Sequence, residues 1–216
     1  KLRIVQNGTL GSLRYPSRLT PAPLQRPAVT TVAGMYHRKG IAQLIAAFEQ
    51  VASRFQDAHL YLVGDGPDRA AFEAQVKTSG VRDRIHFEGF QTEPQRYLQS
   101  TDVFVLASHR EPFGLVLAEA REAGCAIVAS NVDGIPEALS GGKAGKLVPV
   151  DDPETLAAEI SQLLQSSELL NIWKMKAKQN LDWLSVSRMH EETLGVYAEL
   201  VPGWEGGPAA GLTSVS

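Results

Sequence analysis

The feature that most constrains the fold is an alternation along the chain that begins at Val29. Short apolar runs rich in β-branched residues alternate with longer segments in which apolar residues recur every three or four positions. The short runs predict strands, and the longer segments predict amphipathic helices. Strands that alternate with helices form parallel sheets joined by crossover helices. The sequence therefore predicts an α/β fold with a doubly wound, mostly parallel sheet of about six strands flanked by helices.

The apolar runs place the six strands at residues 29–33, 59–63, 85–87, 102–106, 127–130 and 145–148. The run that begins at Val103 is continuous, which suits a strand covered on both faces, so we expect this strand to be central. Helices are predicted at about 41–55, 68–79 and 94–99, near Gly114 and Pro136, and from 153 to about 201.

Three regions are predicted. Residues 1–28 read as an N-terminal strand, at 2–5, followed by a proline-rich extended linker. Residues 29–201 form the main domain with its C-terminal helices. Residues 202–216, rich in glycine and small polar types, are expected to be a disordered tail.

Charge argues against a polyanionic partner. Lys and Arg total 21 against 24 Asp and Glu, a formal net charge of −3. General attraction to nucleic acid or anionic lipid needs a basic excess, so we expect no nucleic-acid partner. The longest apolar runs are far shorter than the roughly 20 residues that cross a bilayer, so no transmembrane segment is expected.

Cysteine usage points to a reducing compartment. Cys125 is the only cysteine, which excludes a disulfide framework and a clustered zinc site. We therefore expect a cytoplasmic protein. Separately, we expect no bound metal ion and no resident cofactor, with the nucleotide sugar acting as a substrate.

Ligands of doubly wound sheets bind outside the carboxyl ends of the strands. The segments expected to carry function are therefore those just after strands: 34–40, 64–67, 88–90, 107–114 and 131–136.

The most informative of these segments joins the fourth strand to a helix and carries two glutamates, Glu111 and Glu119. Both carboxylates can border a ligand at the amino end of that helix, where the free amides of Phe113, Gly114 and Leu115 suit phosphate or hydroxyl oxygens. A carboxylate also accepts two hydrogen bonds from a vicinal diol, as found in ribose and hexose. The alternative is that Glu119 only caps a helix or pairs on a solvated face.

The string Glu111-Pro-Phe-Gly-Leu with Glu119 eight residues on resembles the donor-binding domain of retaining GT-B glycosyltransferases of family 4 (glycosyl transferases group 1). Further segments match that family in order: Val32-Ala33-Gly34 with Lys39-Gly40, Val63-Gly64-Asp65-Gly66-Pro67, Phe87-Glu88-Gly89-Phe90, Gly134-Ile135-Pro136-Glu137 and Gly145-Lys146-Leu147-Val148-Pro149. The resemblance covers residues 29–153 and implies that the main domain binds a nucleotide sugar.

The resemblance also implies roles for individual residues. Glu111 would contact the transferred sugar, Glu119 would hold the ribose, and Lys39 would pair with the diphosphate. The backbone near Gly89 would meet the base. Gly34 would let the backbone approach the phosphates, although as a turn glycine it has an equally simple structural explanation.

The chain departs from the family in the first of these loops. Family members usually have an arginine after the first glycine, which helps the lysine hold the diphosphate, and this chain has Met35 there. Arg38 either replaces that cation or faces solvent.

The resemblance also implies that this chain does not include the acceptor-binding half of such an enzyme, apart from residues 2–27, which resemble the interdomain region with Asn7-Gly8. We therefore expect the donor-binding half of a retaining glycosyltransferase of the hexosyltransferase type, inactive alone, completed by an N-terminal domain or partner chain. The alternative is a non-catalytic nucleotide-sugar-binding subunit. A sugar-nucleotide epimerase is disfavoured by Glu-Pro-Phe-Gly, and a signalling receiver domain by the lack of an acidic cluster after the first strand. Peripheral membrane contact of the full enzyme remains open.

Overall fold

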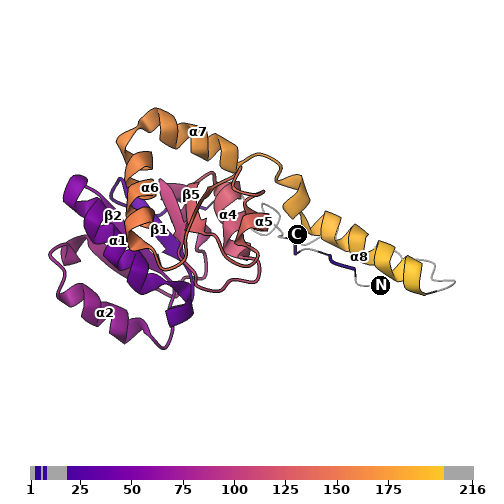
Figure 1. Ribbon diagram of the computed structural model, residues 1–216, viewed down its shortest axis with the longest axis horizontal. Helices are drawn as coiled ribbons and strands as arrows, with labels where there is room; N and C mark the ends of the chain where they lie inside the picture. The colour runs from indigo at the N-terminus through magenta and orange to yellow at the C-terminus, as the bar shows by residue number, and fades with distance from the viewer. Residues whose placement is uncertain (1–2, 6, 9–18, 202–216) are drawn as a thin grey trace.

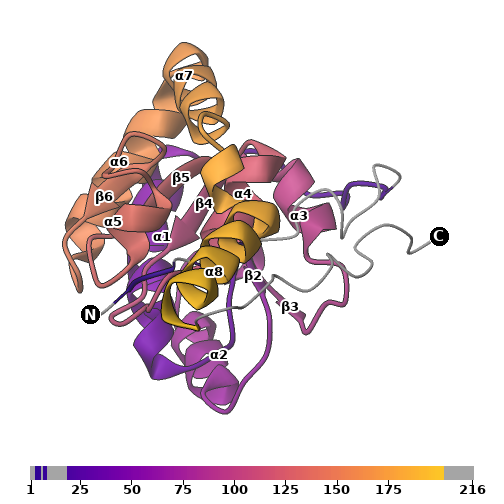
Figure 2. The same ribbon diagram turned by 90° about the vertical axis from the view of Figure 1, so that its right-hand side faces the viewer.

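The structure is a computed structural model that describes residues 3–5, 7–8 and 19–201. The tail expected at 202–216 lies outside the described residues. Six strands form one sheet: β1 (Ala28–Val32), β2 (His59–Val63), β3 (Ile85–Gly89), β4 (Val103–Leu106), β5 (Ala126–Ser130) and β6 (Lys146–Val148). They lie in the order β3-β2-β1-β4-β5-β6, and every neighbouring pair is parallel. The predicted fold class is confirmed, and Figure 2 shows β3 and β6 at the two edges of the sheet.

Helices connect the strands. They are α1 (Ile41–Arg54), α2 (Arg69–Lys77), α3 (Gln95–Ser100), α4 (Leu115–Ala123), α5 (Ile135–Ala138), α6 (Pro153–Gln165), α7 (Ser167–Ala177) and α8 (Val186–Leu200), with short 3-10 turns η2 (His37–Lys39), η3 (Arg82–Arg84) and η4 (Asp182–Leu184). Local sequence explains their limits. At the start of α6, for example, the Asp152 side chain accepts a hydrogen bond from the amide of Thr155 at 2.9 Å, and Pro153 occupies the first turn.

Two hydrophobic layers cover the sheet. One packs α1, α2 and α6 against one face, and the other packs α3, α4, α5 and the end of α7 against the opposite face. Figure 1 shows α1 and α2 on one side of the strands and α4 and α5 on the other. Strand β4 contributes to both layers and all four of its residues are buried, as expected for a central strand.

A fully buried arginine ties α4 to its neighbours. The Arg121 guanidinium donates hydrogen bonds to the backbone carbonyls of Ala138 at 2.7 Å, Ala177 at 3.0 Å and Gln179 at 2.5 Å. Burial lowers the pKa of Arg121, and the three carbonyls supply the partners that a buried donor requires. The helix that begins beside the candidate site is therefore held firmly at its far end.

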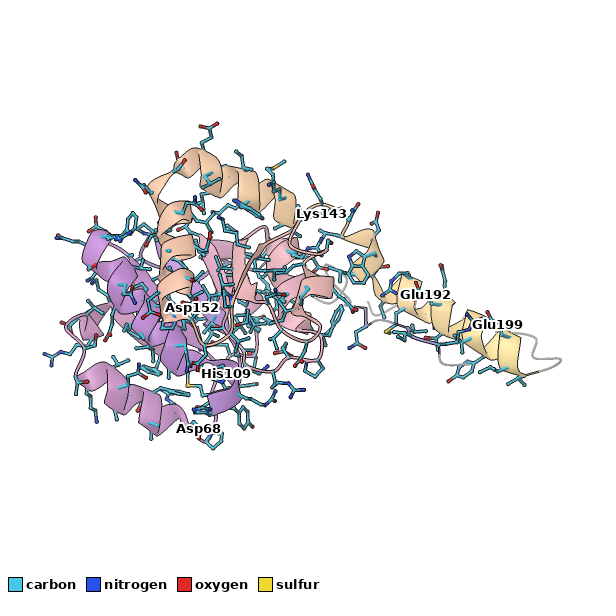
Figure 3. All side chains as sticks on the ribbon, viewed as in Figure 1. Asp68, His109, Lys143, Asp152, Glu192 and Glu199 are labelled. Carbon is cyan, nitrogen blue, oxygen red and sulfur yellow. The ribbon has the colours of Figure 1, made fainter. Side chains whose placement is uncertain are left out.

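The N-terminal segment does not form the predicted strand over its described residues. Residues 3–5 join no sheet because they lie beside α8, where Arg3 pairs with Glu199. The Gly8 amide contacts the Met189 sulfur at 3.2 Å. Figure 1 shows α8 projecting from the body of the protein, and Figure 3 labels Glu192 and Glu199 on it, away from the sheet.

None of the helices in the described part of the chain has the length and hydropathy that a bilayer crossing requires.

Candidate functional site

The strand order creates a crevice between β1 and β4. These strands are neighbours, but the chain leaves β1 towards β2 and leaves β4 towards β5, in opposite directions across the sheet. At such a switch point the two following loops separate, and ligands bind between them. The segment after β1 carries Lys39, and the segment after β4 carries Glu111.

The two loops contact each other through their backbones. The His109 amide donates a hydrogen bond to the Arg38 carbonyl at 2.8 Å. Gly40, with φ of 65°, lies so close to the second loop that a Cβ there would be 1.9 Å from the Ala107 carbonyl oxygen. Only glycine permits both this backbone conformation and this approach. The contact fixes the spacing between Lys39 and Glu111.

Lys39 and Glu111 form an ion pair inside the crevice. The Lys39 ammonium donates a hydrogen bond to Glu111 Oε2, and both side chains are largely buried. The Ser108 hydroxyl lies 3.4 Å from the same oxygen. Glu111 Oε1 accepts no hydrogen bond from any residue that the structure describes. The pair therefore leaves one Glu111 carboxylate oxygen and further N–H donors of the Lys39 ammonium available to a ligand.

The amino end of α4 lies at the same place. Gly114 precedes the helix and supplies no capping side chain. The amides of Phe113, Gly114 and Leu115 donate no hydrogen bond to another described residue. Phe113 itself is buried, with its ring edge-on to Trp183 at 6.2 Å. The helix end thus presents free backbone donors, which suit an anion.

A pocket of about 320 Å³ joins these features. It is lined by Asn7, Val32, Lys39, Glu111, Pro112, Phe113, Gly114, Leu115 and Val116. Five of the nine proposed site residues thus share one cavity: Lys39, Glu111, Phe113, Gly114 and Leu115. This cavity has a cation, a carboxylate and a helix amino end on one wall, an arrangement that can bind a phosphate beside a hydroxylated ring.

Glu119 stands one turn further along α4 and does not line the pocket. Residues three and four apart share a helix face, so Glu119 lies on the face that carries Leu115 and Val116. It is half-buried, and its charge contributes, after burial, to the raised pKa of Glu122.

Gly34, Arg38 and Gly89 also lie outside the pocket lining. Gly89 ends β3, which is separated from β4 by β2 and β1. Arg38 is exposed, and its guanidinium stacks over the Tyr36 ring at 5.7 Å. Gly34 lies two residues after Val32, which ends β1 and lines the pocket. The structure thus brings part of the predicted set together and leaves these three at its periphery.

Met35 leaves no empty slot for a second cation. Its side chain is 1% exposed and belongs to the hydrophobic layer beneath α1. Its amide and carbonyl bond to the Asp65 carbonyl at 2.9 Å and the Asp68 amide at 3.1 Å.

Sequence reasoning assigned no site role to five residues of this region. Four of them line the pocket: Asn7, Val32, Pro112 and Val116. The fifth, Asp133, accepts a hydrogen bond from the Glu111 amide at 2.9 Å. The Asp-Gly turn signal after β5 could have marked Asp133.

The described residues contain no group of three or more histidine, cysteine, aspartate or glutamate side chains able to hold a metal ion.

Relatives of this chain are glycosyltransferases and related synthases. It is 34% identical over 143 residues to N-acetyl-alpha-D-glucosaminyl L-malate synthase of Bacillus anthracis, a match of 66% of this chain and 37% of that protein. It is 34% identical over 169 residues to phosphatidyl-myo-inositol mannosyltransferase of Mycolicibacterium smegmatis, covering 73% and 43% of the two chains. The chain therefore spans less than half the length of either relative.

Solved structures share the fold. Sucrose-phosphate synthase of Thermosynechococcus elongatus superposes with a TM-score of 0.79 at 26% identity, over 92% of this chain and 52% of that one. Anabaena HepE in complex with UDP superposes with a TM-score of 0.74 at 22% identity, over 80% and 48% of the two chains.

A family match covers most of the sequence. Residues 18–180 match the family described as glycosyl transferases group 1. The matched range contains both crevice loops, β1 to β6 and all of α4. The chain belongs to the glycosyl transferases group 1 family.

Proposed function

We propose that this chain is the C-terminal, donor-binding half of a retaining glycosyltransferase and that it binds a nucleoside-diphosphate sugar in the crevice between β1 and β4. The observation that carries the proposal is the meeting of the Lys39 ammonium, the Glu111 carboxylate and the free amides at the start of α4 in one pocket. The neighbouring HepE structure holds UDP, which makes a uridine nucleotide the first probe.

The pocket suits the charges that develop during glycosyl transfer. Negative charge grows on the departing diphosphate, and Lys39 with the α4 amides can stabilise it. Positive charge spreads over the anomeric carbon and ring oxygen of the sugar. The open Oε1 of Glu111 can accept a sugar hydroxyl and stabilise this charge. Glu119, on the α4 face that carries Leu115 and Val116, is assigned to the ribose. The backbone near Gly89 is assigned to the base.

The proposal includes a division of labour with a second half. An enzyme must position the nucleophile and exclude water around the reacting bond, and this pocket is bounded by residues of one domain. We propose that an N-terminal domain or partner chain supplies the acceptor, and that the chain alone binds donor without transferring sugar. A cytoplasmic location is proposed from the single cysteine, Cys125, which is buried as a free thiol.

The test is calorimetric titration of the 216-residue chain with UDP, GDP and ADP, followed by transfer assays with the matching sugar nucleotides. We expect at least one diphosphate to bind with a dissociation constant below about 1 mM, a binding free energy of about −4 kcal/mol or stronger. We expect no multiple-turnover transfer. Failure of all three nucleotides to bind would contradict the donor site, and sustained turnover would contradict the half-enzyme.

A further inference from the structure

We propose that Asp133 is a positioning residue for Glu111: its carboxylate fixes the Glu111 backbone and so directs the Glu111 side chain towards the sugar of the donor. The inference rests on the proposed function, which makes Glu111 the sugar contact.

The loop after β5 holds both polar groups of the Glu111 main chain. Asp133 Oδ2 accepts a hydrogen bond from the Glu111 amide at 2.9 Å. The Gly134 amide donates one to the Glu111 carbonyl at 3.1 Å. One dipeptide on the neighbouring loop therefore clamps the residue from both sides.

The clamp is tight because the two loops are in close contact. A Cβ at Gly134 would lie 2.0 Å from the Pro112 carbonyl oxygen and 2.9 Å from the Phe113 Cα. No side chain fits there without moving the loop that carries Glu111. The segment 132–134 thus forms a rigid support directly beneath the residues that line the pocket.

The backbone conformation at Asp133 does not itself call for an aspartate. Its φ is 47°, in the left-handed region, which glycine adopts at no steric cost and which aspartate tolerates better than most residues. A glycine would satisfy the turn but would leave the Glu111 amide without this acceptor. The hydrogen bond to the Glu111 amide therefore explains why an aspartate stands at this position.

Asp133 is well suited to hold an amide. The exposed Arg110 donates from Nε to the same Oδ2 at 2.9 Å. The hydrogen bonds from Arg110 and the Glu111 amide hold the pKa of Asp133 below its usual value, so the group is ionised at neutral pH. An ionised acceptor makes a stronger hydrogen bond than a neutral one.

A displacement of the Glu111 backbone would move its carboxylate and so change the contact with the ligand. Lys39 also holds the Glu111 carboxylate, but its ammonium keeps further N–H donors for the diphosphate, so a backbone shift would mainly change the sugar contact. Misplacement by about 1 Å can cost on the order of 100-fold in rate in an enzyme. In a binding step we expect a smaller loss, confined to ligands that carry the sugar.

The experiment compares Asp133→Gly with Asp133→Asn and Arg110→Ala. Asp133→Gly keeps the turn and removes the acceptor. Asp133→Asn keeps a side-chain oxygen acceptor, and Arg110→Ala removes the other partner of Asp133. For each folded variant, hydrogen exchange of the Glu111 amide is measured without ligand, and affinities for UDP and UDP-glucose are measured by calorimetry.

We expect Asp133→Gly to accelerate exchange of the Glu111 amide at least about tenfold and to weaken UDP-glucose about tenfold, while UDP changes less than about threefold. Asp133→Asn keeps only a neutral acceptor and should lie between the wild type and Asp133→Gly on both counts, whereas Arg110→Ala should stay within about threefold of the wild type. If hydrogen exchange of the Glu111 amide is unchanged in Asp133→Gly, Asp133 does not hold this amide and the proposal is wrong. Faster exchange with an unchanged ratio of UDP-glucose to UDP affinity overturns the positioning role. A wild-type chain that binds neither probe contradicts the proposed function, whereas the exchange measurement still decides the clamp.

Discussion

Two buried carboxylates lie at opposite ends of β4, and their surroundings differ. Asp102, 4% exposed, directly precedes the strand, and Glu111, 8% exposed, follows it. Asp102 accepts hydrogen bonds from Arg26 Nε at 2.9 Å, from the Ala28 amide at 3.0 Å and from the Lys174 ammonium at 3.0 Å, so both of its oxygens are occupied. Glu111 uses one oxygen for Lys39 and Ser108 and leaves the other open beside a pocket.

The difference separates a structural acid from one available to a ligand. A buried charge is tolerated when donors satisfy it, and the Asp102 cluster joins the linker, β1 and α7 at the amino edge of the sheet. Glu111 lies at the carboxyl edge, where doubly wound sheets bind ligands. An incompletely satisfied carboxylate in a pocket can gain a partner from a bound molecule. Burial alone therefore does not distinguish the two acids, whereas the number of their hydrogen-bond partners does.

The largest effect is expected on stability at the amino edge. Asp102→Ala should lower the free energy of unfolding by about 3 kcal/mol, because it leaves Lys174 and Arg26 without their shared acceptor. Glu111→Ala should cost only about 1 kcal/mol, since Lys39 borders a pocket that water can enter. Chemical denaturation of both variants measures the difference. Equal losses would remove the distinction between the two acids.

The next effect concerns nucleotide affinity at the carboxyl edge. Lys39→Ala should weaken binding of the diphosphate at least about 100-fold, or about 2.7 kcal/mol, because it removes the cation of the pocket. Arg38→Ala is the matched control one residue away. Its side chain is exposed and stacked on Tyr36, so we expect a loss of less than about tenfold. Calorimetry with the best-bound nucleotide compares them, and a larger loss for Arg38→Ala would show that the diphosphate lies outside the pocket.

The two glutamates should separate by ligand. Glu119→Ala should weaken the nucleoside diphosphate itself, whereas Glu111→Ala should spare the diphosphate and weaken only the sugar-bearing donor. A lost hydrogen bond to a charged group costs about 1.5–3 kcal/mol, or roughly ten- to a hundred-fold in affinity. Titration of both variants with UDP and UDP-glucose gives four affinities. If each variant weakens both ligands equally, the assignment of Glu111 to the sugar and Glu119 to the ribose is wrong.

The sheet could be predicted because its signal is local. Each strand is a short apolar run, and α1 buries residues spaced by three and four, including Ile41, Leu44, Ile45 and Phe48. The predicted bounds of β2 match the observed ones, and those of the other strands differ by at most two residues, as with β3, which continues to Gly89. Loops after parallel strands meet at one edge, so the proximity of Lys39 and Glu111 also follows from the predicted topology.

The partners of buried polar groups could not be predicted in this way. Arginine is a residue type that is usually exposed, yet Arg121 is fully buried, and its guanidinium donates to three backbone carbonyls of other segments. The sequence predicts Asp102 at the start of a strand. Its partners, however, come from segments more than 70 residues away in sequence. Such contacts depend on how separate segments pack, and the hydrophobic periodicity of one segment does not determine that packing.

The smallest expected effect is the pH dependence of the amino-edge cluster. Burial alone would raise the pKa of Asp102, but hydrogen bonds from Arg26, the Ala28 amide and Lys174 outweigh it and hold the pKa below its usual value. A depressed folded-state pKa contributes stability that is fully present above the unfolded value of about 3.9 and is lost as pH falls through the folded pKa. The difference in unfolding free energy between wild type and Asp102→Asn should therefore be constant from pH 7 to pH 5 and shrink below about pH 4.

The comparison with Asp102→Asn is needed because another pair titrates in the same direction. His59 Nδ1 lies 2.9 Å from His86 Nε2. Burial lowers the pKa of both rings, with the neighbouring His86 adding to the effect at His59. Folding favours their neutral forms, so stability from this pair is present above about pH 6.5 and declines as the rings take up protons. This decline occurs in wild type and variant alike and cancels in their difference. A difference that already shrinks between pH 7 and pH 5 would show that Asp102 is coupled to the histidine pair rather than to Arg26 and Lys174.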